Sequence, residues 1–282
     1  MEPTRTIDGV RIPPILYGTA WKEERTHGLV RLALAAGFRG LDTANQRKHY
    51  VEADVGAALG AAVAAGEVVR EDVFVQTKFT HRGGQDQRLP YDPRAPIGAQ
   101  VKQSCARSLE HLGIAVIDSY LLHGPSVRGG LAPADVEAWR AMEDLRSAGT
   151  VRLLGISNVS AAQLDRLLAI ARAPIAFVQN RCYASAGWDR DVRARCRERG
   201  IVYQGFSLLT ANRKELAHPA LRAIAQREKL TPEQLVFRFA VAVGMLPLTG
   251  TSSAAHMAQD LAALTVPLDA ADVQAIEDIA RA

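Results

Sequence analysis

Six short apolar runs in the 282-residue chain each end in a polar side chain that could take part in chemistry. In chain order these side chains are Asp42, Lys78, His123, Ser157 with Asn158, Gln179 with Asn180, and Ser207. A single residue of this kind is usually a helix cap or a satisfied core group. Six in succession, with an acid and a lysine after neighbouring runs, indicate polar groups gathered at one site.

The acid and the lysine predict an ion pair that serves a nearby phenol. A buried lysine tends to lose its proton, and an adjacent carboxylate such as Asp42 keeps Lys78 charged. A cation beside a phenol lowers the phenol pKa from about 10, so that the hydroxyl can exchange a proton near neutral pH. Tyr50 lies eight residues after Asp42, and His123 could orient a substrate oxygen. The set fits reduction of a carbonyl group by a cofactor's hydride, because no side chain supplies a hydride.

The elements that must position these groups alternate regularly along the chain. Helical periodicity repeatedly ends at a glycine (Gly37, Gly113, Gly149, Gly200 and Gly244), and an apolar run follows at once. Strands are predicted near 15–19, 38–42, 73–78, 116–122, 151–156, 176–180, 201–206 and 245–249. Eight strands alternating with helices, without a linker, predict a single (β/α)8 TIM barrel over residues 1–282. No Gly-x-Gly-x-x-Gly follows a strand, which argues against a doubly wound Rossmann sheet.

Local signals refine this picture. Ser160 with Gln163 forms a capping-box pattern, and Thr231 followed by Pro232 predicts another helix start. The longest irregular stretch, at about 79–96, follows a strand and is expected to overhang the active-site face together with residues 124–132.

Composition excludes several other classes of protein. With 48% hydrophobic and 23% charged residues the chain is neither disordered nor fibrous, and its net charge is only +4. The basic run from Arg190 to Arg199 has helical spacing and is expected to be a solvated helix face, so we expect no nucleic-acid partner. No membrane span or signal peptide is apparent. Three cysteines without a C-x-x-C pair indicate reduced thiols and a cytoplasmic protein.

A metal-dependent barrel hydrolase is the least favoured alternative. His49, His81 and His123 do not have the spacing of a metal motif, so no metal is expected.

The segments that carry these residues resemble the aldo-keto reductase family over nearly the whole chain. They read LYGTAW, GFRGLDTA, VFVQTKF, SLEHLGIAVIDSYLLHGP, GTVRLLGISNVS, FVQN and QGFSLL. The resemblance implies a TIM-barrel oxidoreductase that binds an extended nicotinamide dinucleotide and reduces a small carbonyl compound. Asp42, Lys78 and His123 match three members of the family's catalytic tetrad, and Trp21 matches a substrate-facing aromatic.

The resemblance also implies most of the cofactor ligands. Six positions match the family pattern: Ser157, Asn158 and Gln179 for the nicotinamide carboxamide, Phe206 for the stacked aromatic, and Ser207 and Leu209 for the pyrophosphate loop.

The first departure from the family concerns the fourth tetrad member, a tyrosine. The family usually reads Asp-Thr-Ala-x-x-Tyr, whereas here Arg47 stands at the tyrosine position in a loop two residues longer. Counting back from the following helix reaches His49. We predict Tyr50 as the proton donor, provided that the extra residues bulge before it, with His49 as the alternative. If Tyr50 instead packed under the long loop, the barrel would be a non-catalytic dinucleotide-binding or redox-sensing protein.

The second departure concerns the adenosine end of the cofactor. Relative to the family's Pro-Lys-Ser, Arg and Glu-Asn, the replacements are Gly250, Thr251, His256, Gln259 and Asp260. Gly250, Thr251 and Ser252 still offer donors at a helix N-terminus, and Arg213 and Lys214 are possible substitutes for the missing cations. The family resemblance favours NADPH, and NADH remains possible.

Overall fold

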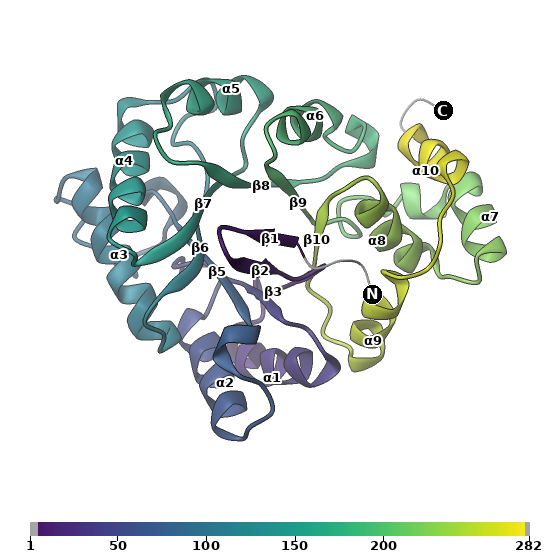
Figure 1. Cartoon of the computed structure of the whole chain (residues 1–282), viewed down its shortest axis with the longest axis horizontal. Helices are drawn as coiled ribbons and strands as arrows, with labels where there is room; N and C mark the ends of the chain where they lie inside the picture. The colour runs from purple at the N-terminus through teal and green to yellow at the C-terminus, as the bar shows by residue number, and fades with distance from the viewer. Residues whose placement is uncertain (1–4, 280–282) are drawn as a thin grey trace.

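The computed structural model describes residues 5–279, and eight parallel strands form a closed barrel at its centre (Figure 1). Hydrogen bonding around the barrel follows the order β10-β3-β4-β5-β6-β7-β8-β9. The strands are β3 (Leu16–Gly18), β4 (Gly40–Asp42), β5 (Phe74–Phe79), β6 (Ile117–Leu122), β7 (Val151–Ser157), β8 (Ile175–Arg181), β9 (Val202–Phe206) and β10 (Leu246–Thr249). All eight predicted strands are confirmed, as is the (β/α)8 fold.

Helices surround the barrel, most of them in the order of the chain, and the last one returns to lie beside the helix at residues 219–227 (Figure 1). They are α1 (Thr26–Ala36), α2 (Glu52–Ala64), α3 (Ile97–Leu112), α4 (Pro133–Ser147), α5 (Ala161–Ile170), α6 (Arg190–Glu198), α7 (Pro219–Arg227), α8 (Pro232–Ala242), α9 (Ala254–Ala263) and α10 (Ala270–Glu277). Short 3-10 turns occupy Glu23–Arg25, Arg70–Asp72, Arg82–Gly84, Ala184–Ala186 and Glu215–Ala217. Of these helices, none is long and apolar enough to cross a membrane over the described residues.

The local signals in the sequence act as predicted. Ser160 and Thr231 each accept a hydrogen bond from a backbone N–H in the first turn of α5 and α8, and both capping boxes form. Gly37 and Gly113 end α1 and α3 with φ values of 109° and 64°, in the left-handed region that a residue with a side chain avoids. These caps turn the chain directly from helix to strand.

An N-terminal hairpin was not predicted. Strands β1 (Arg5–Ile7) and β2 (Val10–Ile12) pair antiparallel through Asp8 and Gly9, which both have positive φ. An Asp-Gly pair is a strong signal for such a turn, but the surrounding segment is too short and polar to stand out as strands.

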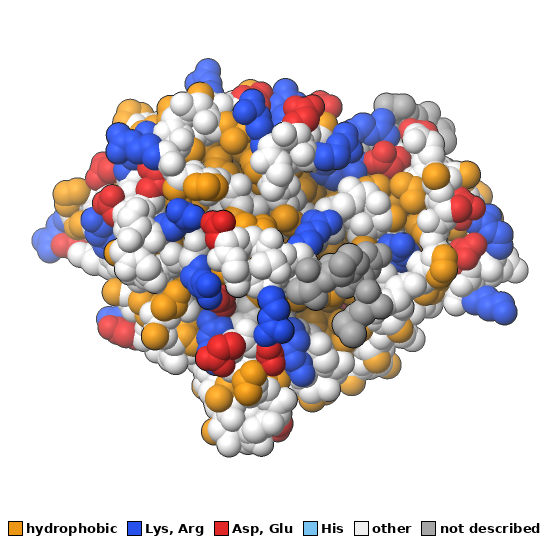
Figure 2. Space-filling model, in the orientation of Figure 1, with side chains coloured by type: hydrophobic (Ala, Val, Ile, Leu, Met, Phe, Trp, Pro, Cys, Tyr) orange, Lys and Arg blue, Asp and Glu red, His pale blue; other side chains and the backbone are white. Residues whose placement is uncertain are grey.

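The hairpin closes one end of the barrel. Val10 and Ile12 are buried in a cluster with Phe74, Val202 and Leu246, the first residues of β5, β9 and β10. Figure 1 shows the hairpin across the barrel axis, and Figure 2 shows basic and acidic side chains interspersed over the same face. The opposite end, where the strands finish, is left open for the site.

Candidate active site

A cleft of about 1190 Å³ opens where the barrel strands end. It is lined by residues at or soon after the ends of β3, β4, β6, β7, β9 and β10. Residues 80, 81, 83 and 84 of one long loop and residues 124–126 of the other complete this part of the lining. Of the loop expected at about 79–96, the cleft lining includes only residues near its start. Of the predicted catalytic residues, Asp42, Tyr50 and His123 line the cleft, and Lys78 is buried at its floor.

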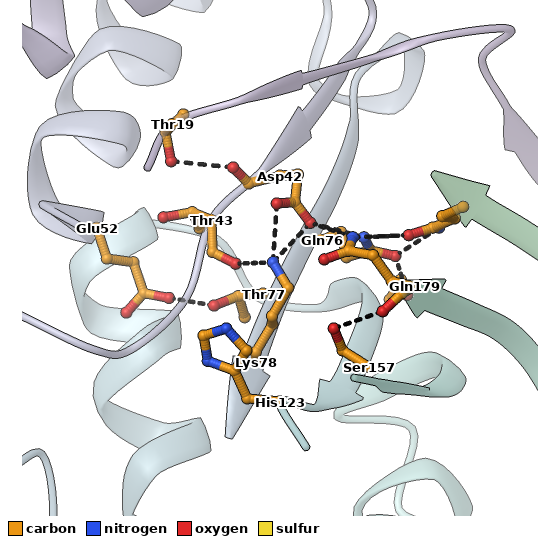
Figure 3. A network of polar contacts seen from close by, with 12 residues as sticks. Thr19, Asp42, Thr43, Glu52, Gln76, Thr77, Lys78, His123, Ser157 and Gln179 are labelled. Carbon is orange, nitrogen blue, oxygen red and sulfur yellow. Dashed lines mark hydrogen bonds and ion pairs between the residues drawn. The ribbon is translucent and has the colours of Figure 1, made fainter. Parts of the chain in front are cut away.

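The ion pair at the floor of the cleft forms as predicted. Lys78 Nζ lies 2.7 and 2.8 Å from the two carboxylate oxygens of Asp42 and donates a further hydrogen bond of 2.8 Å to the carbonyl of Thr43 (Figure 3). Lys78 and Asp42 are both buried, at 0% and 3% exposure. Burial lowers the pKa of Lys78, while the charges of Asp42 and Glu52 oppose that shift. The carboxylate therefore favours the charged form of an amine that solvent does not reach.

An amide network inside the barrel holds the Asp42 carboxylate. Gln76 and Gln179 donate hydrogen bonds of 2.7 and 2.9 Å to the same oxygen of Asp42. Both amides also donate to the side chain of Gln204, which returns a hydrogen bond to Gln76 (Figure 3). Because each buried amide is paired, the carboxylate has one fixed orientation toward Lys78.

Tyr50 lies against this ion pair. The backbone N–H groups of His49 and Tyr50 both donate to the carbonyl of Gln46, so the two extra residues form a turn just before the tyrosine. Lys78 Nζ lies 5.5 Å from the centre of the Tyr50 ring, and that ring packs edge-to-face on His123 at 6.0 Å. The bulge that the sequence required is present.

His49 occupies a different place from Tyr50. Its imidazole stacks on Trp21, with ring centres 3.9 Å apart, and its Nδ1 lies 2.8 Å from the side-chain oxygen of Gln46. Trp21 is 66% exposed at the edge of the cleft, where an aromatic facing the substrate was expected. The two candidates for the proton donor thus lie in different places: Tyr50 lies beside the Lys78 ammonium, and His49 packs on Trp21 at the edge of the cleft.

The prediction that Lys78 lowers the pKa of Tyr50 is wrong in this structure. Burial, reinforced by the negative charge of Asp42, raises the pKa of Tyr50 above its ordinary value. Lys78 Nζ lies over the Tyr50 ring, and its charge is partly balanced by Asp42. The phenol therefore keeps its proton throughout the neutral pH range.

His123 is held as a neutral imidazole. Its Nδ1 lies 2.7 Å from the hydroxyl oxygen of Thr80, and its backbone carbonyl accepts a 2.8 Å hydrogen bond from the Asn158 amide. Burial and the charge of Lys78 lower the pKa of His123 to about 3. The ring therefore offers a single N–H and no charge.

The residues predicted for the nicotinamide end come together on one wall of the cleft. Ser157 donates a 2.6 Å hydrogen bond to the carbonyl of Gln179, and Asn158 follows it with φ of 53°. Phe206 and Ser207 leave β9 side by side, and Ser207 also has positive φ, at 56°. Left-handed backbone at non-glycine residues is uncommon and gathers at functional sites. Leu209 lines the same wall.

The far end of the cleft agrees only in part with the sequence prediction. Gly250, Thr251, His256, Gln259 and Asp260 line it. Ser252 is exposed outside the cleft lining, because the helix begins later and Ser253 caps α9. Arg213 and Lys214 are exposed and do not line the cleft, so they do not replace the missing cations.

The sequence did not predict how two charged residues, Asp260 and Lys22, are arranged at this far end. Burial raises the pKa of Asp260 to about 6, and its carboxylate accepts a 2.7 Å hydrogen bond from Thr249. Lys22 lines the cleft and its ammonium donates a hydrogen bond to the carbonyl of Gly250. Nothing in the sequence placed Lys22 beside Gly250, because 228 residues separate them.

Comparison with known proteins agrees with this geometry. The family model described as the aldo/keto reductase family matches residues 15–281. The chain belongs to the aldo/keto reductase family. The protein is therefore an NAD(P)H-dependent oxidoreductase.

Individual relatives cover nearly the same length as this aldo/keto reductase. Aldo-keto reductase AKR2E4 of Bombyx mori is 28% identical over 291 residues, which cover 95% of this chain and 89% of the relative. An aldo-keto reductase of Mycolicibacterium vanbaalenii is 29% identical over 251 residues, which cover 89% of this chain and 81% of the relative. The crystal structure of the Bombyx mori protein, solved in complex with NADP, superposes with a TM-score of 0.82 at 25% identity, covering 98% and 92% of the two chains.

This aldo/keto reductase also has site residues that sequence reasoning missed. Gln76 and Gln204 lie in the middle of buried strands, two residues before Lys78 and Phe206. The signal was a polar residue at an inward-facing strand position, which alternation places on the same side as the site residue two positions later. Thr80 has the same spacing beyond Lys78 and was also overlooked.

Proposed function

We propose that the protein reduces an aldehyde or ketone with NADPH and that Tyr50 donates the proton to the carbonyl oxygen. The observation that carries the proposal is the position of Tyr50, whose ring lies over the Lys78 ammonium on one side and against His123 on the other. The phenol thus lies beside a fixed positive charge and a neutral donor, at the open end of the barrel.

The protonation states support reduction. Because burial raises the pKa of Tyr50, the phenol holds a proton that it can donate to the oxygen as that atom gains electrons. The phenolate that remains is stabilised by Lys78 Nζ, 5.5 Å from the ring centre. His123, neutral because its pKa is lowered to about 3, donates a hydrogen bond that orients the carbonyl. Asp42 keeps Lys78 charged throughout.

The residues present fit a nicotinamide dinucleotide, which supplies the hydride when bound. The cleft is larger than the roughly 300–1,000 Å³ of a typical drug-sized site. The Gln179 amide nitrogen is already bonded to Asp42 and Gln204, so its oxygen is the group left for the nicotinamide carboxamide. Ser157 and Asn158 flank it, and the Phe206 ring offers a face for stacking.

Anion-binding groups continue along the same cleft. Ser207 and Leu209 follow β9 at the position proposed for the pyrophosphate, and Lys22 adds a positive charge near Gly250. The solved NADP complex of the Bombyx mori relative favours NADPH over NADH. Above about pH 6 the charged Asp260 carboxylate repels a 2′-phosphate, so we expect NADH to bind as a second cofactor.

Turnover on a panel of aldehydes and ketones, with NADPH and NADH titrated in parallel, tests the proposal. We expect NADPH oxidation that depends on the carbonyl compound, together with NADPH binding at about micromolar concentration, at the lower end of the usual KM range of enzymes. Binding of NADPH without turnover of any compound in the panel would favour the non-catalytic dinucleotide-binding barrel instead.

We also propose a cytoplasmic location. Cys105, Cys182 and Cys196 are all free and buried, and burial raises the pKa of each to about 12, so none is poised to form a disulfide. Three titratable thiols in unfolded protein purified without reductant would support this, and a disulfide would contradict it.

A further inference from the structure

Thr80 is the first residue after β5 and lies between the catalytic floor and the long loop. Its side chain is 5% exposed, and its hydroxyl oxygen lies 2.7 Å from His123 Nδ1. Its backbone carbonyl accepts a 2.8 Å hydrogen bond from the hydroxyl of Tyr91, which is buried under the loop, and a longer one of 3.4 Å from Gln85. The backbone of Thr80 is therefore held in place by the loop as well as by the strand.

The direction of the hydrogen bond follows from counting donors and acceptors. A neutral imidazole has one N–H and one bare nitrogen, and a hydroxyl can either donate or accept. Among residues 5–279 the Thr80 hydroxyl has no hydrogen-bond partner other than His123 Nδ1. If Nδ1 carried the proton, the buried hydroxyl hydrogen of Thr80 would have no acceptor, which costs free energy.

The opposite nitrogen of the ring faces the cleft. His123 lines the cleft next to Tyr50, and in the described part of the chain no hydrogen bond reaches its Nε2. When Thr80 donates to Nδ1, the single imidazole proton must be on Nε2.

We propose that Thr80 is a positioning residue that fixes the tautomer of His123, so that Nε2–H points into the cleft as the hydrogen-bond donor to the substrate oxygen. The tautomer itself rests on the contacts of Thr80. Its use in catalysis rests on the proposed reductase function.

The test compares Thr80→Val, which keeps the shape and removes the hydroxyl, with Thr80→Ser, which keeps the hydroxyl. The direct readout is the ¹⁵N NMR spectrum of the full-length protein labelled in histidine, with the His123 signals assigned by their loss in His123→Asn. We expect a bare Nδ1 and a protonated Nε2 in the wild type and in Thr80→Ser, and a mixture of the two tautomers in Thr80→Val. A structural role alone would leave the tautomer unchanged.

Kinetics provides the second readout. We expect kcat for carbonyl reduction to fall roughly tenfold in Thr80→Val, the factor that corresponds to one lost hydrogen bond, with NADPH affinity unchanged and near-complete recovery in Thr80→Ser. A wild-type spectrum with the proton on Nδ1 overturns the proposal, even if Thr80→Val fails to fold. Thr80→Val with an unchanged tautomer and unchanged kcat overturns it as well. A tautomer that changes as expected in a protein that reduces no carbonyl compound supports the role of Thr80 and refutes the reductase function.

Discussion

Replacement of Lys78 by Met is expected to destabilise the protein strongly as well as to stop turnover. The substitution keeps the volume of the side chain but leaves the Asp42 carboxylate buried, with the amides of Gln76 and Gln179 as donors and no positive charge. Removal of one partner from a buried ion pair costs about 3–5 kcal/mol of unfolding free energy. Asp42→Asn should cost a similar amount, because the Lys78 ammonium then has only neutral acceptors, the Thr43 carbonyl and the asparagine oxygen, and no negative charge beside it.

The double variant Lys78→Met/Asp42→Asn separates stability from catalysis. It removes both charges and keeps an oxygen acceptor for the Gln76 and Gln179 amides. Its loss of unfolding free energy should therefore be smaller than the sum of the losses in the two single variants by about 2 kcal/mol or more. All three variants should lack turnover, because Lys78→Met and the double variant lose the amine beside Tyr50 and Asp42→Asn loses the carboxylate that keeps that amine charged.

Urea unfolding followed by far-ultraviolet circular dichroism measures these differences, and the pH dependence gives a further check. Since burial lowers the pKa of Lys78, the unfolded state binds more protons at alkaline pH, so Asp42→Asn should gain stability from pH 7 to pH 10. Full wild-type stability in Lys78→Met, or additive losses in the double variant, would refute the assignment of a coupled buried pair.

Three further predictions follow from particular contacts. The Asp260 carboxyl keeps its proton up to about pH 6 in the folded state but releases it near pH 3.8 in the unfolded state, so the protein loses stability as the pH rises through this range. In urea unfolding, Asp260→Asn should therefore be as stable as the wild type at pH 3.5 and more stable by about 2 kcal/mol at pH 8. Gly56→Ala should lower the free energy of unfolding by about 1–3 kcal/mol, because the added Cβ would lie 2.1 Å from the carbonyl oxygen of His111. Its control is Gly60→Ala on the same helix, where the added Cβ meets nothing within 4 Å, so thermal unfolding should show an unchanged or slightly higher stability. The kcat for reduction should stay level from pH 5 to about pH 9, since Tyr50 and His123 titrate outside that range; a tenfold change with a midpoint between pH 6 and 8 would contradict their assigned protonation states.

The barrel was predictable because its signals are local and repeated. A glycine such as Gly113 ends several of the helices and an apolar strand follows at once, and eight strands alternating with helices without a linker favour a closed barrel. Asp42, Lys78 and His123 were predictable for the same reason, since a polar residue at the end of a buried strand must lie at the rim. Their common location followed from the fold.

Other parts of the site depend on contacts that sequence spacing does not reveal. The place of Tyr50 was settled by a backbone turn at Gln46 that absorbs the inserted residues. Lys22 reaches Gly250 only because β3 and β10 are neighbours in the closed barrel. The pKa of Tyr50 also required the structure, because its sign depends on how far burial outweighs a charge that Asp42 already balances.

The central claim is that the proton comes from Tyr50 and not from His49, and single-turnover kinetics with the matched variants Tyr50→Phe and His49→Phe tests it most directly. With enzyme in excess over NADPH and a reactive aldehyde present, the decay of NADPH fluorescence reports the reduction step. We predict that Tyr50→Phe slows this decay by about 100-fold or more at unchanged NADPH affinity, while His49→Phe keeps a rate within about threefold of the wild type. A fast decay in Tyr50→Phe together with a slow one in His49→Phe would contradict the account.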